Sequence, residues 1–238
     1  MVRQIWTFIL LFAPYLLFGQ SNSTDKRAIS IADSVTLAMG GKANWDSVHY
    51  LKWTFFGKRT LYWDKWSGNV RIEIPSKELV ILTNLNTHKG KVFYGGKELT
   101  NSDSNAYYMD HGYKIWANDS YWLIMPFKLL DPGVTLLYKG TVNDKKGDLC
   151  FQLELTFNEV GVTPENKYNI YINRKTYQVT QWDYFEKYTN LTPDLSNPWE
   201  HYQYYGKILL SDDRGPEMGK LTDVAVMDTV SKGLFQTL

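Results

Sequence analysis

The stretch at residues 118–140, N-D-S-Y-W-L-I-M-P-F-K-L-L-D-P-G-V-T-L-L-Y-K-G, decides how the rest of the chain is arranged. Seven of the nine residues at 122–130 are apolar, yet Pro126 and Pro132 prevent one continuous helix or strand here. Because large exposed apolar patches are rare on monomeric proteins, other elements are expected to cover this insert. Most of the remaining chain alternates like β-strands, so the sequence predicts a curved sheet around an apolar insert.

Composition narrows the class of protein. The 238 residues suit one domain with ample core, and 16% of them are aromatic, including nine Trp and seventeen Tyr. Trp and Tyr favour surfaces with one dry and one wet side. The formal net charge is +1, so a basic face for nucleic acid or anionic membranes is not indicated.

Residues 1–19 are typical of a secretory signal peptide. Arg3 gives the positive start, residues 5–18 form the apolar segment, and Gly19 ends it with a small residue. An apolar segment this short does not reach the roughly 20 residues that a membrane span needs. No cysteine follows it for lipid attachment, and Cys150 is the only cysteine, so no internal disulfide is possible. We therefore predict a soluble, monomeric periplasmic protein, with residues 20–238 as its single domain and no stable membrane span.

The N-terminal part of that domain reads as helix. Asp25 is a suitable N-cap for a helix at residues 26–39, with Ala28, Ala32 and Val35 on one apolar stripe. Gly40 and Gly41 end it in the usual way, and a short turn at residues 42–47 follows. Later, residues 102–118 are predicted to be partly helical, although Gly112 weakens the pattern.

Strands dominate elsewhere. Alternation of apolar and polar residues predicts strands at residues 49–57, 60–64, 70–74 and 151–157, and the apolar run 78–84 predicts a central strand. Residues 167–172 and 178–187 are predicted to form a hairpin, 199–210 a strand pair and 221–227 an edge strand. Two prolines make residues 191–198 a loop in this prediction. The fold class is α+β, mainly β, with an N-terminal helix and a mid-chain helical or irregular insert.

Three segments carry a resemblance to a known family. They are residues 38–53, residues 61–73 with the pattern Leu-Tyr-Trp-Asp-Lys before a turn, and the late hairpin that begins at Tyr168. With the apolar insert, they resemble the LolA/LolB superfamily of periplasmic lipoprotein carriers. That resemblance implies a curved antiparallel half-barrel with helices in its concavity. Residues 121–134 and 161–164 resemble more closely an uncharacterised group of exported Bacteroidota proteins.

One position departs from the carriers. Their turn after the second strand carries an arginine that helps to hold the apolar lid shut, whereas this chain has Trp66 there. An indole cannot make the paired hydrogen bonds of a guanidinium. The resemblance therefore implies the fold without implying a lipoprotein shuttle cycle.

The inward face of such a half-barrel defines the candidate binding residues. They are apolar side chains from three strands and from the insert: Trp53, Phe55, Leu61, Trp63, Ile72, Ile74, Trp122, Ile124, Phe127 and Leu129. They form either a cavity for acyl chains or the core beneath the insert and the first helix.

No catalytic or metal-binding motif stands out. His49, His88, His111 and His201 lack the i, i+4 spacing of a helical zinc pair, and Asp110-His111 is interpreted as a surface pair. Cys150 is interpreted as inert packing. We predict no cofactor, no metal, no nucleic-acid partner and no enzymatic activity. Two functions remain: a carrier for a lipid, acyl chain or lipoprotein, or a scaffold protein whose cavity is filled by its own insert.

Overall fold

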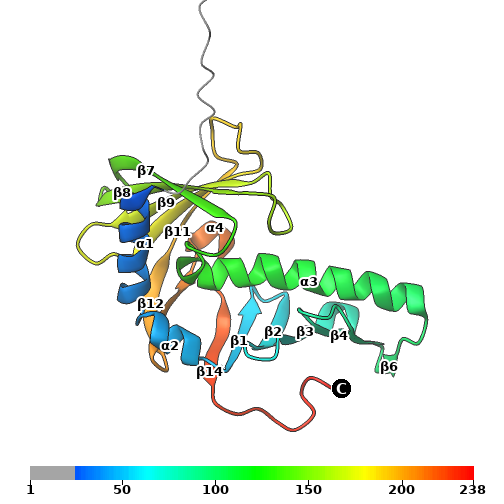
Figure 1. The fold of residues 1–238 in the computed structure, drawn as a ribbon. Helices are drawn as coiled ribbons and strands as arrows, with labels where there is room; N and C mark the ends of the chain where they lie inside the picture. Colours follow the sequence, from blue (N-terminus) through cyan, green and yellow to red (C-terminus); the bar gives the residue numbers. More distant parts are fainter. Residues whose placement is uncertain (1–24) are drawn as a thin grey trace, which may run out of the picture.

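The computed structural model describes residues 25–238, so the predicted signal peptide at residues 1–19 lies outside the described residues. Within that range, the strands form antiparallel, open and curved sheets, and none of them closes into a barrel (Figure 1). The predicted fold class is confirmed. No helix among these residues has the length and apolarity needed to cross a bilayer.

The larger sheet, sheet A, has seven strands in the described range. Its order is β14 (Thr222–Met227), β1 (Tyr50–Phe55), β2 (Arg59–Asp64), β3 (Asn69–Ile74), β4 (Leu79–Asn84), β5 (Gly90–Tyr94) and β6 (Lys97–Glu98). The edge strand predicted at residues 221–227 is thus β14, which pairs with β1.

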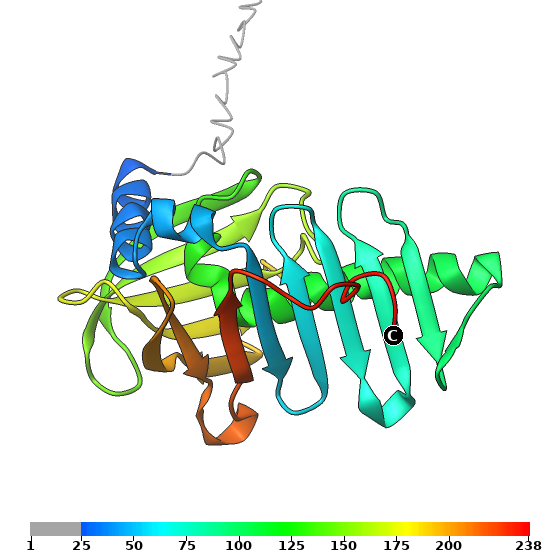
Figure 2. The ribbon, with the colours of Figure 1, turned by 90° about the horizontal axis from the view of Figure 1, so that it is seen from below.

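Sheet B has five strands, and a two-stranded hairpin lies between it and sheet A (Figure 2). Sheet B runs in the order β11 (Leu195–Pro198), β10 (Val179–Phe185), β9 (Lys167–Asn173), β8 (Leu149–Phe157) and β7 (Val134–Asn143). The hairpin is β12 (Glu200–Tyr205) with β13 (Ile208–Asp213). The hairpin and strand pair predicted in this half are confirmed, but the predicted loop at 191–198 was wrong, because its last four residues pair with β10 as β11.

The described residues also form four α-helices. They are α1 (Lys26–Ala38), α2 (Lys42–Ser47), α3 (Ser102–Ile124) and α4 (Gly215–Met218), with 3-10 turns η1 (Pro75–Lys77) and η2 (Met125–Phe127). Asp25 caps α1 as predicted: its carboxylate accepts from the N–H of Ala28 at 2.6 Å and from that of Tyr138 at 2.7 Å. These bonds tie α1 to β7 and lower the pKa of Asp25.

Helix α3 differs from the sequence prediction in its length and continuity. It runs unbroken through Gly112 to Ile124, so residues 118–124 are helical and not irregular, and Pro126 follows directly in η2. Asn101 caps its start by accepting from the N–H of Ser104. The helix lies across one face of sheet A (Figure 1).

A row of directly opposed, fully buried side chains crosses sheet A beneath α3. Strand pairing joins them in the order Trp53, Leu61, Ile72, Ile81 and Val92. Such cross-strand neighbours are the stabilising unit of a sheet face.

Gly112 lets α3 approach this row closely. A Cβ at that position would lie 3.0 Å from Cγ2 of Ile81 and 3.4 Å from Cγ2 of Thr83. The glycine that weakens the helical pattern in the sequence is therefore the contact point of the helix on the sheet.

The opposite face of sheet A is crossed by the C-terminal segment (Figure 2). Nη1 of Arg71 donates to the carbonyls of Leu234 at 3.1 Å and Thr237 at 2.6 Å. The Phe235 ring stacks near Tyr50, with centroids 6.1 Å apart. Both faces of the sheet are thus covered.

A larger side chain at position 112 should push α3 away from sheet A. We expect Gly112→Leu to lower the free energy of unfolding by roughly 1–3 kcal/mol, the usual cost of overpacking. Ala106→Leu places the same side chain on an exposed position of the same helix and should change it by less than about 0.5 kcal/mol. Urea denaturation of both variants measures this; equal stability of the two would contradict the close packing.

Candidate ligand-binding site

The ten predicted binding residues gather around α3 and its continuation. Eight of them are buried, with at most 8% of each side chain exposed: Trp53, Phe55, Leu61, Trp63, Ile72, Ile74, Ile124 and Leu129. Trp122 and Phe127 are half-buried. Phe127 stacks on Trp45 with ring centroids 4.5 Å apart. Helix α3 therefore fills the hollow over sheet A, and of the ten residues Trp122 also lines an open cavity.

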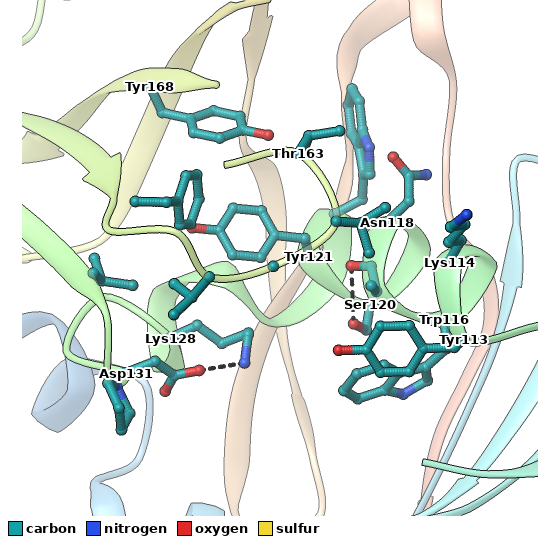
Figure 3. Close-up of a pocket in the computed structure, with 18 of the residues that line it drawn as sticks. Tyr113, Lys114, Trp116, Asn118, Ser120, Tyr121, Lys128, Asp131, Thr163 and Tyr168 are labelled. Atoms are coloured by element: carbon teal, nitrogen blue, oxygen red, sulfur yellow. Dashed lines mark hydrogen bonds and ion pairs between the residues drawn. The ribbon is translucent and has the colours of Figure 1, made fainter. Parts of the chain in front are cut away.

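That cavity lies between the C-terminal half of α3 and the inner face of sheet B (Figure 3). Its volume is about 270 Å³. Its walls are Tyr121 and Trp122 on α3, with Phe157, Tyr168 and Trp182 from β8, β9 and β10. The loops at residues 131–134 and 160–163 complete the lining.

Aromatic rings build the inner wall. The Trp122 and Trp182 centroids are 4.8 Å apart, edge to face, and Tyr168 stacks on Trp182 at 5.0 Å. Tyr121 lies 5.6 Å from Tyr168 and 6.2 Å from Phe157. These spacings are those of favourable aromatic pairs, so the wall is a rigid apolar surface.

A glycine shapes the loop side of the cavity. Gly133 has φ +84°, and a Cβ there would lie 2.4 Å from Cγ1 of Val160. The N–H of Asn158 donates to the Gly133 carbonyl at 2.8 Å. The two lining loops therefore pack directly on one another, which requires glycine at this position.

The charged groups of the lining are paired. Lys128 forms an ion pair with Asp131, and Nζ of Lys114 lies 2.7 Å from a carboxylate oxygen of Asp110, which is outside the lining. Burial raises the pKa values of the Tyr121 and Tyr168 hydroxyls, so both stay neutral at physiological pH. The cavity is thus mainly aromatic, with neutral hydroxyls and paired charges among its polar groups, and a mostly apolar lining is usual for a small-molecule site.

A buried ion pair holds α3 beside the cavity. Nε and Nη2 of Arg59 donate to the two oxygens of Asp119 at 2.5 and 2.6 Å, and Asp119 has no exposed surface. Burial raises the pKa of Asp119, and the Arg59 hydrogen bonds act against that rise. Such a two-point contact fixes position as well as charge.

A second buried cation holds the end of the helix. Arg214 has no exposed surface, and it donates to the Trp122 carbonyl and to the carbonyl of Ser211 at 3.0 Å. Its guanidinium carbon lies 3.6 Å from the centre of the Trp199 ring. Burial lowers the pKa of Arg214 to about 9.

Sequence reasoning missed both arginines. The period-two pattern of β2, extended by one residue, puts Arg59 on the face of Leu61 and Trp63 and so gave a usable signal. Arg214 follows β13 in no recognisable pattern. Trp66, at the position where the carriers have arginine, is 62% exposed and stacks on His49 with centroids 3.8 Å apart.

The histidines and the cysteine do not form a reactive cluster in the described part of the chain. Asp110 pairs with Lys114, and the His111 ring stacks on Tyr107. Cys150 is buried, with Sγ 3.5 Å from the Thr180 hydroxyl. No group of three metal-ligating side chains converges within residues 25–238.

Two histidine–carboxylate contacts join residues that are distant in sequence and so gave no local signal. Nδ1 of His201 lies 2.7 Å from Asp212, and Nε2 of His49 lies 3.4 Å from Asp64.

No protein-family model and no curated protein matches this sequence. A DUF1329 family protein from Desulfovibrio piger is 13% identical over 88% of this chain and 97% of its own, with a TM-score of 0.47. A putative outer membrane lipoprotein-sorting protein domain from Vibrio parahaemolyticus is 7% identical over 88% and 96%, with a TM-score of 0.45.

A LolA superfamily protein from Nitrosomonas europaea is 10% identical over 85% of this chain and 96% of its own, with a TM-score of 0.41. Its description names the superfamily that the sequence resembles. The grouping with exported Bacteroidota proteins stays a prediction.

Removing Arg59 should leave the Asp119 carboxylate buried without its counter-charge. We expect Arg59→Met to cost about 3–5 kcal/mol of unfolding free energy at pH 7. A folded-state pKa above the unfolded one favours folding at low pH, and this contribution is lost as pH rises through the folded pKa. The deficit should therefore shrink between pH 7 and pH 4.

Denaturant titrations at the two pH values measure this effect. The double variant Arg59→Met/Asp119→Leu should recover most of the loss, since no charge then remains buried. Lys114→Met breaks an exposed ion pair on the same helix and should cost less than about 1 kcal/mol. A pH-independent deficit in Arg59→Met would contradict the account.

Proposed function

We propose that this chain is an exported, non-catalytic binding protein that holds one hydrophobic chain, such as the acyl chain of a lipid, in the cavity between α3 and sheet B. The observation that supports the proposal is that cavity: about 270 Å³ of space walled by aromatic rings, which the protein's own helix leaves unfilled. Concave, mostly apolar sites with a few polar groups are the common form of ligand pocket.

The size of the cavity suggests a small occupant. Ligand pockets usually span roughly 300–1,000 Å³, so this one lies just under the lower limit. One chain fits such a space, whereas the several acyl chains of a lipoprotein need more. A single apolar chain is therefore the favoured ligand, and a complete lipoprotein shuttle is not part of the proposal.

The proposed subcellular localisation rests on the sequence. The signal-peptide pattern at residues 1–19 suggests export, and the balanced charge of the remaining chain gives no reason to expect nucleic acid as a partner. The periplasm, where lipids must cross water between two membranes, suits a carrier with one dry cavity.

A scaffold function is the second candidate. Helix α3 covers the row of buried side chains from Trp53 to Val92 on sheet A, so the chain itself fills most of the concavity. A protein of this kind would present its outer surface to partners and bind no small ligand. Ligand titration separates the two candidates.

Straight-chain alcohols from hexanol to dodecanol provide the test. Each buried methylene contributes about 0.8 kcal/mol, so affinity should rise roughly fourfold per methylene and level off once the cavity is full. A change in intrinsic tryptophan emission reports binding, because Trp122 and Trp182 form the wall and a ligand alters their surroundings. Absence of binding across the series would favour the scaffold function.

A cavity-filling pair of variants assigns the site. Ala117 lines the cavity, so Ala117→Phe should weaken dodecanol binding at least tenfold. Ala106→Phe makes the same change at an exposed position of the same helix and should leave binding unchanged. Equal binding by both variants would place the ligand elsewhere and contradict the proposal.

A further inference from the structure

Three buried polar groups of the residues that line the cavity have no partner within the protein: the Tyr121 hydroxyl and the indole N–H groups of Trp116 and Trp182. The hydroxyl of Tyr121 is buried and, among the described tyrosines, is the one buried hydroxyl that lacks a hydrogen-bond partner. Unpartnered indoles occur as well in the core, at Trp53, Trp63 and Trp199, so the tyrosine hydroxyl is the more telling group. A buried donor that forms no hydrogen bond destabilises a folded protein.

Aromatic neighbours hold the Tyr121 ring in the wall of the cavity. It extends from α3 into the space between the helix and sheet B (Figure 3). Phe157, Tyr168 and Trp182 lie around it, with ring centroids 6.2, 5.6 and 6.1 Å away. The ring therefore has a fixed position in the wall of the cavity.

Several neighbouring polar groups already have partners. The Asn118 amide donates to Asp119 at 2.9 Å, and the Ser120 hydroxyl donates to the Ala117 carbonyl at 3.4 Å. Lys128 is paired with Asp131. The lining thus contains three unpartnered neutral donors, the Tyr121 hydroxyl and the indole N–H groups of Trp116 and Trp182, and no unpaired charge.

We infer that the ligand carries a neutral hydrogen-bond acceptor, such as the carbonyl of an ester-linked or amide-linked acyl chain, and that Tyr121 is the residue that selects it. The hydroxyl donates to the carbonyl oxygen while the hydrocarbon lies against Trp122 and Trp182. This inference rests on the proposed function, and it adds the class of ligand.

A carboxylate is disfavoured at this place. A charged group loses most of its hydration on entering an apolar cavity, and no unpaired cation among the described lining residues offsets that loss. Burial raises the pKa of the Tyr121 hydroxyl, so it remains a donor at neutral pH. A free fatty acid should therefore bind more weakly than its ester.

The test compares methyl decanoate, decanoate at pH 8 and n-tridecane, an alkane of equal size, by the change that each causes in intrinsic tryptophan emission. In the wild-type protein, methyl decanoate should bind more tightly than decanoate. Tyr121→Phe should weaken methyl decanoate roughly five- to tenfold, the worth of one neutral hydrogen bond, and leave n-tridecane unchanged. Tyr107→Phe removes an exposed hydroxyl from the same helix and should change none of the three affinities.

Each outcome has a distinct meaning. Equal loss or no loss for ester and alkane in Tyr121→Phe overturns the inference but leaves the proposed function standing. Tighter binding of decanoate than of its ester overturns the inference that the ligand carries a neutral acceptor. Binding of none of the three overturns both the inference and the proposed function. Thermal unfolding serves as the folding control, and Tyr121→Phe should melt no lower than wild type, since it removes an unsatisfied donor.

Discussion

The close packing of α3 on sheet A is the constraint on which the rest of the structure depends. Gly112 brings the helix backbone against Ile81 and Thr83, and the Arg59–Asp119 pair fixes it further along. A buried ion pair adds little net stability over an apolar pair, but it specifies position strongly. These two contacts define one packing position for the helix on the sheet.

With α3 in that position, the half-barrel has two different parts, one over sheet A and one over sheet B. Over sheet A the side chains of α3 share one core with the buried row from Trp53 to Val92, and the glycine contact brings the helix close to that row. Over sheet B the helix presents Tyr121 and Trp122, whose rings meet Tyr168 and Trp182 at aromatic spacing and cannot close the remaining space. Dense packing in one half and a cavity in the other follow from the residues that one helix places on its two ends.

The sequence predicted the sheets well, because period-two alternation reports directly which strands are half-buried. It did not predict the continuity of α3, since helix propensity treats Gly112 as a defect while tertiary packing needs it. The ten candidate residues were drawn mainly from sheet A. Alternation shows that a face is buried, but a helix and a ligand bury it equally well. Phe157, Tyr168 and Trp182 alternate too, yet only the position of α3 leaves space beside them.

The central claim, that the space beside sheet B receives an apolar chain, is tested most directly by crystallography. Crystals grown with a bromine-terminated alkyl ester allow the chain end to be located by anomalous scattering. The account predicts a bromine peak enclosed by Trp122, Phe157, Tyr168 and Trp182. A peak on the outer surface of the sheets, or a cavity without the ligand while the ester binds in solution, would contradict it.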